Sequence, residues 1–259
     1  KTEIENKIHE ALRVAGIPSR TSGELAVGAE IHNTGSTARG TSIPGTVVDF
    51  DIAIRLDETD LAQHGKISDA LDAVLAGEKE SGAANQWRRS GIEIQGKSVD
   101  IDVTYVSKPE VEGMPSHAVV EQRLRAVEQS TPQEADLVRA NIVYAKQVLK
   151  RFNVYKKLDG GLGGLGVENW ILQHGGSFAK ARESVLRAAI DEQGSIRSFE
   201  DCAARYAIPD PGVNLTSDSV EKGATGYGQY RHDNFFYFLN RDGSDGYGKF
   251  IHALQHLAE

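Results

Sequence analysis

The sequence has little of several features that mark particular classes of protein. Its 259 residues include a single cysteine, Cys202, which excludes an internal disulfide framework and a metal site built from several cysteines. No apolar run approaches the ~20 residues that a membrane-spanning helix requires. The first residues, KTEIENKIHEAL, also lack the apolar core of a signal peptide. We therefore expect a cytoplasmic protein that makes no use of a membrane.

Positive charge is in deficit as well. The chain carries 29 Lys and Arg against 37 Asp and Glu, a formal net charge of −8. A large nonspecific nucleic-acid surface depends on many cations that meet phosphates, so this balance argues against one. Two short basic clusters remain, QWRRS (residues 86–90) and KQVLKRFNVYKK (residues 146–157). Each is predicted to be a solvated face unless an anionic partner lies nearby.

Hydrophobic periodicity divides the chain into two parts. The first part mixes helices, predicted at residues 1–15 and 66–80, with strands at 47–56 and a hairpin at 91–106. From about residue 115 the pattern is helical. The sequence predicts an α+β fold with a mixed-sheet domain at residues 1–114, followed by a mostly helical domain at residues 115–259.

Two of the predicted strands each carry a pair of aspartates. In VVDFDIAIRL (residues 47–56), Val48, Phe50, Ile52 and Ile54 alternate with Asp49 and Asp51, so the two carboxylates share the face opposite the apolar one. In VDIDV (residues 99–103), Asp100 and Asp102 alternate with valine and isoleucine in the same way. Such a face either meets water or holds a cation between the strands.

Carboxylates that converge from two strands favour the second alternative. Magnesium prefers a few carboxylate ligands together with waters and substrate phosphates. Two metal ions about 4 Å apart would activate an attacking hydroxyl and stabilise departing pyrophosphate. The segment NTGSTARGTSIPG (residues 33–45) adds a turn in which Gly35 allows close backbone approach and Ser36 offers a hydroxyl to phosphates.

These residues together resemble a known family. GSTARGTSIPGTVVDFDIAI is similar to the G-S…D-x-D signature of the polymerase-β-like nucleotidyltransferase superfamily, and VDIDVTYV is similar to its third-carboxylate strand. The resemblance implies two Mg²⁺ ions, with Mn²⁺ as an alternative, bound by Asp49, Asp51 and Asp102. We prefer Asp102 to Asp100 because the family places this carboxylate just before a short apolar stretch, which leaves Asp100 solvated or supporting. Nucleotide-binding residues implied in this part are Gly35, Ser36 and Arg39.

Within that superfamily, the second half most resembles archaeal-type CCA-adding enzymes. The resemblance runs through AKQVLKRFNVYKK and GGLGGLGVENWIL, and DPGVN (residues 210–214) is similar to a contracted D-P…N-V segment. It implies that Lys146 and Tyr155 contact the triphosphate of the incoming nucleotide. The alternatives are an exposed helical lysine and an amphipathic tyrosine that anchors the end of a helix.

A glycine motif in this half suggests a different cofactor at first sight. Gly161, Gly163 and Gly166 spell G-x-G-x-x-G, but this fingerprint requires a preceding strand. A helical pattern at residues 136–157 comes before it instead. The run is therefore predicted to link two helices of the nucleotide-holding domain.

The sequence thus predicts an enzyme that transfers NMP from an NTP to an acceptor hydroxyl and releases pyrophosphate. The family resemblance favours an RNA 3′ end, such as that of tRNA, as the acceptor. A second nucleotide is the alternative, as in the related oligoadenylate and cyclic-dinucleotide synthases. A nucleotide or RNA sensor without catalysis is the non-enzymatic alternative, which the retained carboxylates disfavour.

Overall fold

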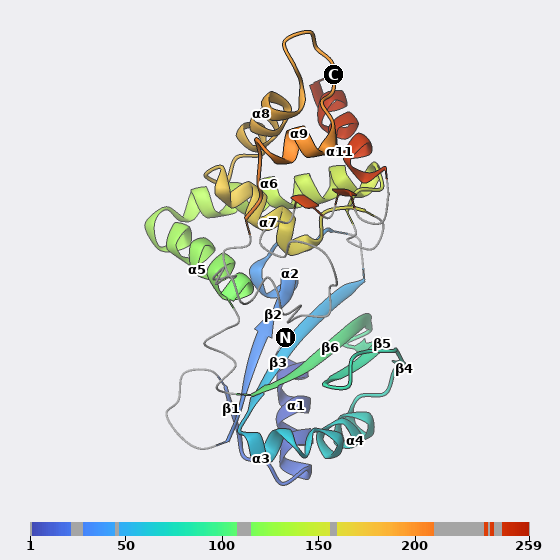
Figure 1. Ribbon diagram of the computed structural model, residues 1–259. Helices are drawn as coiled ribbons and strands as arrows, with labels where there is room; N and C mark the ends of the chain where they lie inside the picture. The colour runs from blue at the N-terminus through green and yellow to red at the C-terminus, as the bar shows by residue number, and fades with distance from the viewer. Residues whose placement is uncertain are drawn as a thin grey trace. The chain divides into compact units, whose positions relative to one another are not determined.

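A computed structural model describes residues 2–21, 28–44, 47–107, 115–155, 160–209, 236–237, 239–240 and 245–258. The chain divides into two compact units, Lys1–Met114 and Pro115–Glu259 (Figure 1). No helix in the described ranges is long and apolar enough to cross a membrane.

The first unit is built on one mixed sheet. Its strands lie in the order β1-β2-β3-β6-β5-β4, with β1–β2 and β3–β6 parallel and the other neighbours antiparallel. This arrangement confirms the predicted α+β class. The elements are α1 (Thr2–Val14), β1 (Ser19–Thr21), β2 (Ala29–Thr34), α2 (Gly35–Arg39), β3 (Val48–Leu56), α3 (Glu58–Leu61), α4 (His64–Val74), β4 (Glu78–Lys79), β5 (Gln86–Ile94) and β6 (Lys97–Ser107).

One face of this sheet carries the core of the unit. Ile52 and Ile54 of β3 and Ile101 and Val103 of β6 are at most 1% exposed and pack in one cluster with the apolar sides of α1 and α4. Each such side chain contributes about 1.5–3 kcal/mol through burial. Ile52 and Ile54 are buried as the alternation predicted. Val48, at the start of the strand, is instead 39% exposed, and Ala53 is only 5% exposed although it lies on the same face as the aspartates.

Three local predictions in this unit need comment. The hairpin is confirmed, and its turn residues Gln95 and Gly96 have φ of 52° and 72°, as a tight two-residue turn requires. The chain turns at Gly35, where φ is 73°, and helix α2 begins at the same residue. The predicted helix at residues 66–80 ends at Val74, because residues 78–79 pair with β5 as strand β4.

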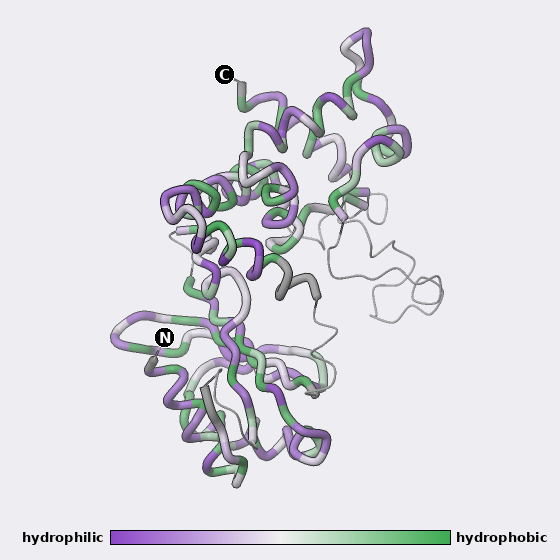
Figure 2. The backbone as a smooth tube through the Cα atoms, turned by 90° about the vertical axis from the view of Figure 1, so that its left-hand side faces the viewer, coloured by the Kyte–Doolittle hydropathy of each residue, from purple (hydrophilic) through white to green (hydrophobic). Residues whose placement is uncertain are grey.

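The second unit is helical in its described residues, as predicted. Trp170 lies at its centre, with its ring edge-on to Phe178 and Phe250. Figure 2 shows hydrophobic and hydrophilic segments alternating along the helices, as expected when each helix buries one face. The elements are α5 (Pro115–Ser130), α6 (Pro132–Arg151), α7 (Gly164–Gln173), α8 (Phe178–Ala189), α9 (Phe199–Ala203), α11 (Gly246–Gln255) and the 3₁₀ helix η4 (His256–Ala258).

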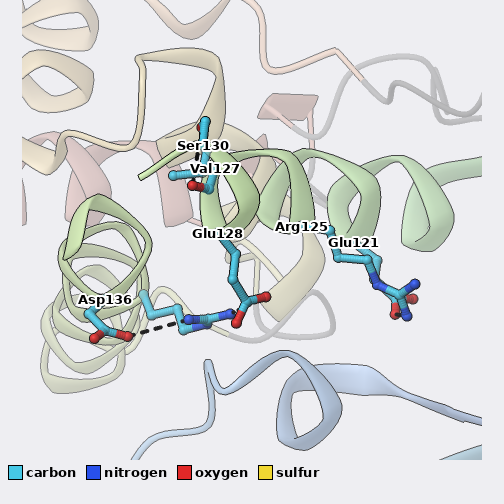
Figure 3. Close-up of polar contacts among 7 residues, drawn as sticks. Glu121, Arg125, Val127, Glu128, Ser130 and Asp136 are labelled. Carbon is cyan, nitrogen blue, oxygen red and sulfur yellow. Dashed lines mark hydrogen bonds and ion pairs between the residues drawn. The ribbon is translucent and has the colours of Figure 1, made fainter. Parts of the chain in front are cut away.

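Helices α5 and α6 are joined by polar contacts as well as by packing. Arg139 of α6 pairs with Glu128 of α5 at 3.2 Å and with Asp136 one turn earlier at 3.4 Å (Figure 3). Helix α6 ends at Arg151, six residues before the predicted end at 157, because Asn153 adopts a φ of 58° that no helix continues. The glycine run then leads into α7, as the sequence predicted for a link between helices.

Candidate active site

The acidic face of the sheet is created by the register of two parallel strands. Asp49 of β3 lies beside Asp100 of β6, and Asp51 lies beside Asp102. Neighbouring residues in register project their side chains to the same face. Because the alternate residues of both strands fill the core, all four carboxylates lie on the opposite face of the sheet.

The charges of these carboxyl groups act on one another. The pKa of Asp49 is raised to about 6, first by partial desolvation and then by the charges of Asp51, Asp102 and Asp100. Arg88 acts in the opposite direction. Burial and three neighbouring negative charges both favour the protonated form of Asp49. A cation at this position would therefore be stabilised.

Asp102 has one oxygen paired and one orphaned. Its Oδ2 forms an ion pair with Arg88 Nε at 2.9 Å, whereas its Oδ1 is buried and has no hydrogen-bond partner among the described residues. Its pKa is raised by burial, an effect that Arg88 opposes and Glu80 reinforces. A buried carboxylate oxygen without a donor is costly unless a cation or a proton meets it. The donor set therefore fits a hard divalent cation such as Mg²⁺.

The carboxylates are neighbours without forming a finished metal cage. Across the described ranges, no group of three or more His, Cys, Asp or Glu side chains is arranged to hold a metal ion. The pairing of Asp102 with Arg88 draws that carboxylate toward β5. Asp102 would have to share or exchange this partner for a cation to bind between β3 and β6.

The two aspartates of β6 have different local roles. Asp100 Oδ1 accepts a hydrogen bond from the backbone N–H of Gly91 at 3.1 Å. Gly91 has a φ of 64° and lies where the pairing of β5 with β6 shifts register. Asp100 thus holds a β-bulge, and its role at the site stays a prediction.

Gly35 lies directly against Asp51. Thr34 pairs with Asp51 across β2 and β3, and the chain turns at Gly35 with a φ of 73°. A Cβ atom at this position would be 1.7 Å from Asp51 Oδ2, a distance no side chain tolerates. The absence of a side chain therefore lets the backbone of α2 touch the carboxylate, as the predicted neighbourhood of residues 35, 36 and 51 requires.

Helix α2 is fastened to the strand that carries the aspartates. The Thr37 hydroxyl donates to the backbone oxygen of Asp49, and the Ser36 and Ser42 hydroxyls are 3.1 Å apart. Ser36 is half-buried, and its contact with a phosphate stays a prediction. Arg39 is only 7% exposed, and its contact with a nucleotide stays a prediction.

Replacing Gly35 with alanine tests this contact. We expect the nucleotidyl transfer predicted from the sequence to fall at least about 100-fold, because the new methyl group displaces the Asp51 carboxylate by more than an ångström. The matched control is Gly96→Ala, which has nearly the same φ, 72°, but no atom within 4 Å of the new Cβ. Both variants should lose about 1–2 kcal/mol from backbone strain in thermal unfolding. Equal activity in the two variants would contradict the proposed role of Gly35.

Asp49 gives a second test, on stability rather than activity. Because the pKa of Asp49 is raised to about 6 in the folded protein, above the 3.8 of an ordinary aspartate side chain, folding favours the protonated form. Its contribution to stability is therefore full below pH ~4 and lost as the pH rises through 6. Without divalent cations, Asp49→Asn should stabilise the protein by about 1 kcal/mol at pH 8, after allowance for solvent screening. The gain should vanish near pH 4 in thermal unfolding; an equal gain at both pH values would contradict it.

A separate polar cluster lies inside the second unit. Lys146 of α6 and Glu168 of α7 are both fully buried, and Lys146 Nζ is 2.7 Å from Glu168 Oε1. Lys146 is therefore not the exposed helical lysine that the sequence left as an alternative. Its contact with a triphosphate stays a prediction, and such a contact requires that the ammonium group be uncovered.

Tyr155 and Gly164 border this pair. A Cβ at Gly164, the first residue of α7, would be 3.2 Å from Tyr155 Oη and 3.8 Å from Lys146 Nζ. Burial, with the charge of Glu168, raises the pKa of Tyr155 to about 12, so its hydroxyl remains a donor at neutral pH. The first turn of α7 has no side-chain cap. Its free N–H groups, with Tyr155 and Lys146, suit an anion.

The sequence did not predict two charged residues of these clusters. Arg88 and Glu168 were not predicted, although a glutamate inside the apolar stretch GVENWIL signals a buried charge that needs a partner. Arg89, in the basic cluster QWRRS, is buried over the Trp87 ring and bonded to Asp72, so this cluster is not a solvated face. The segment DPGVN lies outside the described residues.

Comparison with known proteins gives weak structural likenesses. No protein-family model matches the chain, and no curated protein matches it. A cytoplasmic RNA terminal U-transferase aligns with 67% of this chain and 46% of its own, at 13% identity and a TM-score of 0.45. Cid1, described as an RNA terminal uridylyl transferase, aligns with 67% of this chain and 45% of its own, at 13% identity and a TM-score of 0.48. Cid1 poly(U) polymerase with bound MgGTP aligns with 96% of this chain and 66% of its own, at 11% identity and a TM-score of 0.48.

The chain thus spans between about half and two thirds of the length of these structures. All three are RNA uridylyl transferases or poly(U) polymerases by description, and the likeness to CCA-adding enzymes rests on sequence alone. Because the likenesses are weak, we base the function on the residues of this chain.

Proposed function

We propose that the protein is a magnesium-dependent nucleotidyltransferase. It transfers NMP from an NTP to an acceptor hydroxyl and releases pyrophosphate, and we infer that the acceptor is an RNA 3′ end. The observation that carries the proposal is the β3–β6 register, which sets Asp49 and Asp51 beside the β6 aspartates, together with the approach of Gly35 to Asp51. Without a cation, the charges of Asp51, Asp100 and Asp102 act against ionisation of Asp49.

The chemistry assigned to this face is an in-line displacement. The acceptor oxygen forms a bond to the α-phosphorus, and the bond from that phosphorus to the bridging oxygen of pyrophosphate breaks, with its electron pair leaving on pyrophosphate. When bound, Mg²⁺ supplies a Lewis acid that offsets charge on the phosphates. Asp49, Asp51 and Asp102 would hold it, and we assign to Asp102 the removal of the proton from the acceptor hydroxyl.

The remaining candidate residues position the nucleotide. Gly35 and Ser36 present a backbone surface and a hydroxyl next to Asp51, where phosphates would lie, and we retain Arg39 in the same segment. In the second unit we assign Tyr155, Lys146 and the first turn of α7 to phosphate contacts. Catalysis by such a site comes mainly from positioning and charge neutralisation.

The test is to incubate the full chain with each labelled NTP and Mg²⁺, with and without an RNA bearing a free 3′ hydroxyl. We expect label to be incorporated into the RNA. Small labelled products without RNA would support synthesis of an oligonucleotide or cyclic dinucleotide instead. No product with any NTP, while NTP binding persists, would support a sensor and overturn the proposed function.

A further inference from the structure

We propose that Arg88 is an internal counter-cation of the site. Arg88 pairs with Asp102 until a divalent cation displaces the guanidinium group, and this competition by Arg88 weakens metal binding. The inference rests on the proposed function and names a device that regulates the same site. Arg88 occupies one oxygen of Asp102 through Nε at 2.9 Å, while the other oxygen is buried without a hydrogen-bond partner among the described residues.

The position of Arg88 is fixed by the sheet. Arg88 of β5 lies directly opposite Asp102 of β6, so both side chains project to the acidic face. Its neighbour Arg89 projects to the other face, where it bonds to Asp72. The adjacent arginines of one cluster therefore have different partners, and only Arg88 faces the carboxylates.

A guanidinium and a divalent cation compete for the same carboxylate. Arg88 lowers the repulsion among the aspartates, since its charge opposes the shift in the pKa of Asp49 as well as that of Asp102. A divalent cation at this face would lower the repulsion among the aspartates more strongly than Arg88 does. The positive charge of Arg88 would repel that cation. Binding of the cation is therefore coupled to release of Asp102 by Arg88.

A second carboxylate is available to the released arginine. The backbone N–H of Glu80 donates to the backbone oxygen of Arg88 at 3.3 Å, which holds the two residues side by side. Lys79 pairs with Arg89, so Glu80, just beyond β4, lies opposite Arg88, and the side chains of opposite residues project to the same face of the sheet. The charge of Glu80 also raises the pKa of Asp102. Arg88 can thus pass from Asp102 to Glu80 without leaving the group of charges.

The experiment measures Mn²⁺ binding to the full chain by electron paramagnetic resonance, in the absence of any nucleotide. Arg88→Gln should bind Mn²⁺ roughly fivefold more tightly than the wild type, or more. The matched control is Arg55→Gln, which removes one positive charge from β3 at its opposite end and should change affinity less than about twofold. Unchanged or weaker binding by Arg88→Gln, with a native circular dichroism spectrum, would overturn the inference.

Glu80→Gln provides the second arm. It should weaken Mn²⁺ binding in the wild type, because Arg88 then has no alternative partner, and should have a smaller effect in the Arg88→Gln background. If Glu80→Gln weakens Mn²⁺ binding equally in the wild type and in the Arg88→Gln background, the effect is a simple loss of negative charge. That result would overturn the movement of Arg88 from Asp102 to Glu80. If the wild-type chain itself binds no Mn²⁺, the proposed function fails, whereas wild-type binding without the Arg88 effect overturns this inference alone.

Discussion

Asp51→Asn should reduce nucleotidyl transfer by roughly 10³-fold or more. The substitution keeps the shape of the side chain but removes the negative charge that lies between Gly35 and Asp102. An amide cannot replace a carboxylate as a ligand for Mg²⁺ when charge neutralisation is the main effect. The measurement is the initial rate of label incorporation at saturating Mg²⁺, with Asp102→Asn tested in parallel for the same loss.

Asp100→Asn is the control on the same face. Its carboxylate holds the Gly91 bulge, and an amide oxygen can accept the same hydrogen bond. We expect this variant to keep activity within about tenfold of the wild type, since it leaves the three assigned carboxylates in place. Wild-type activity in Asp51→Asn, or a greater loss in Asp100→Asn than in Asp102→Asn, would refute the assignment of these residues.

Glu168→Gln should destabilise the second unit by about 3 kcal/mol or more. The change removes the negative charge that lies 2.7 Å from the fully buried Lys146 ammonium group. The measurement is urea unfolding followed by Trp170 fluorescence in a Trp87→Phe background, because these are the two tryptophans of the chain. A native-like midpoint for Glu168→Gln would contradict the importance of this pair.

Two further variants separate charge from packing at this site. Glu183→Gln breaks the exposed pair with Arg187, whose side chains are 68% and 77% exposed, and should cost less than about 1 kcal/mol. The double variant Lys146→Met/Glu168→Leu removes both buried charges and should recover most of the stability lost in Glu168→Gln. If that double variant also loses nucleotide affinity, the buried pair has a functional role beyond stability.

Local patterns were sufficient for much of the fold. The alternation in VVDFDIAIRL predicted both the strand β3 and the face on which Asp49 and Asp51 lie, because side chains of a strand alternate between its faces. The apolar stripe Ile4, Ile8, Ala11 and Leu12 predicted α1, and all four residues are buried. Errors occurred at the ends of elements, as at Asn153, where backbone conformation rather than periodicity decides.

The sequence by itself determined which residue types share a face: the aspartates of β3 and β6, opposite the apolar core. Only the tertiary structure decided that Asp51 lies beside Asp102 and that Asp100 serves a bulge, because strand register depends on packing between segments some fifty residues apart. It also decided the pairing of Arg88 with Asp102 and the burial of Lys146 with Glu168. Periodicity gives the direction of a side chain, whereas the partner of a charge is set by whatever the fold places opposite it.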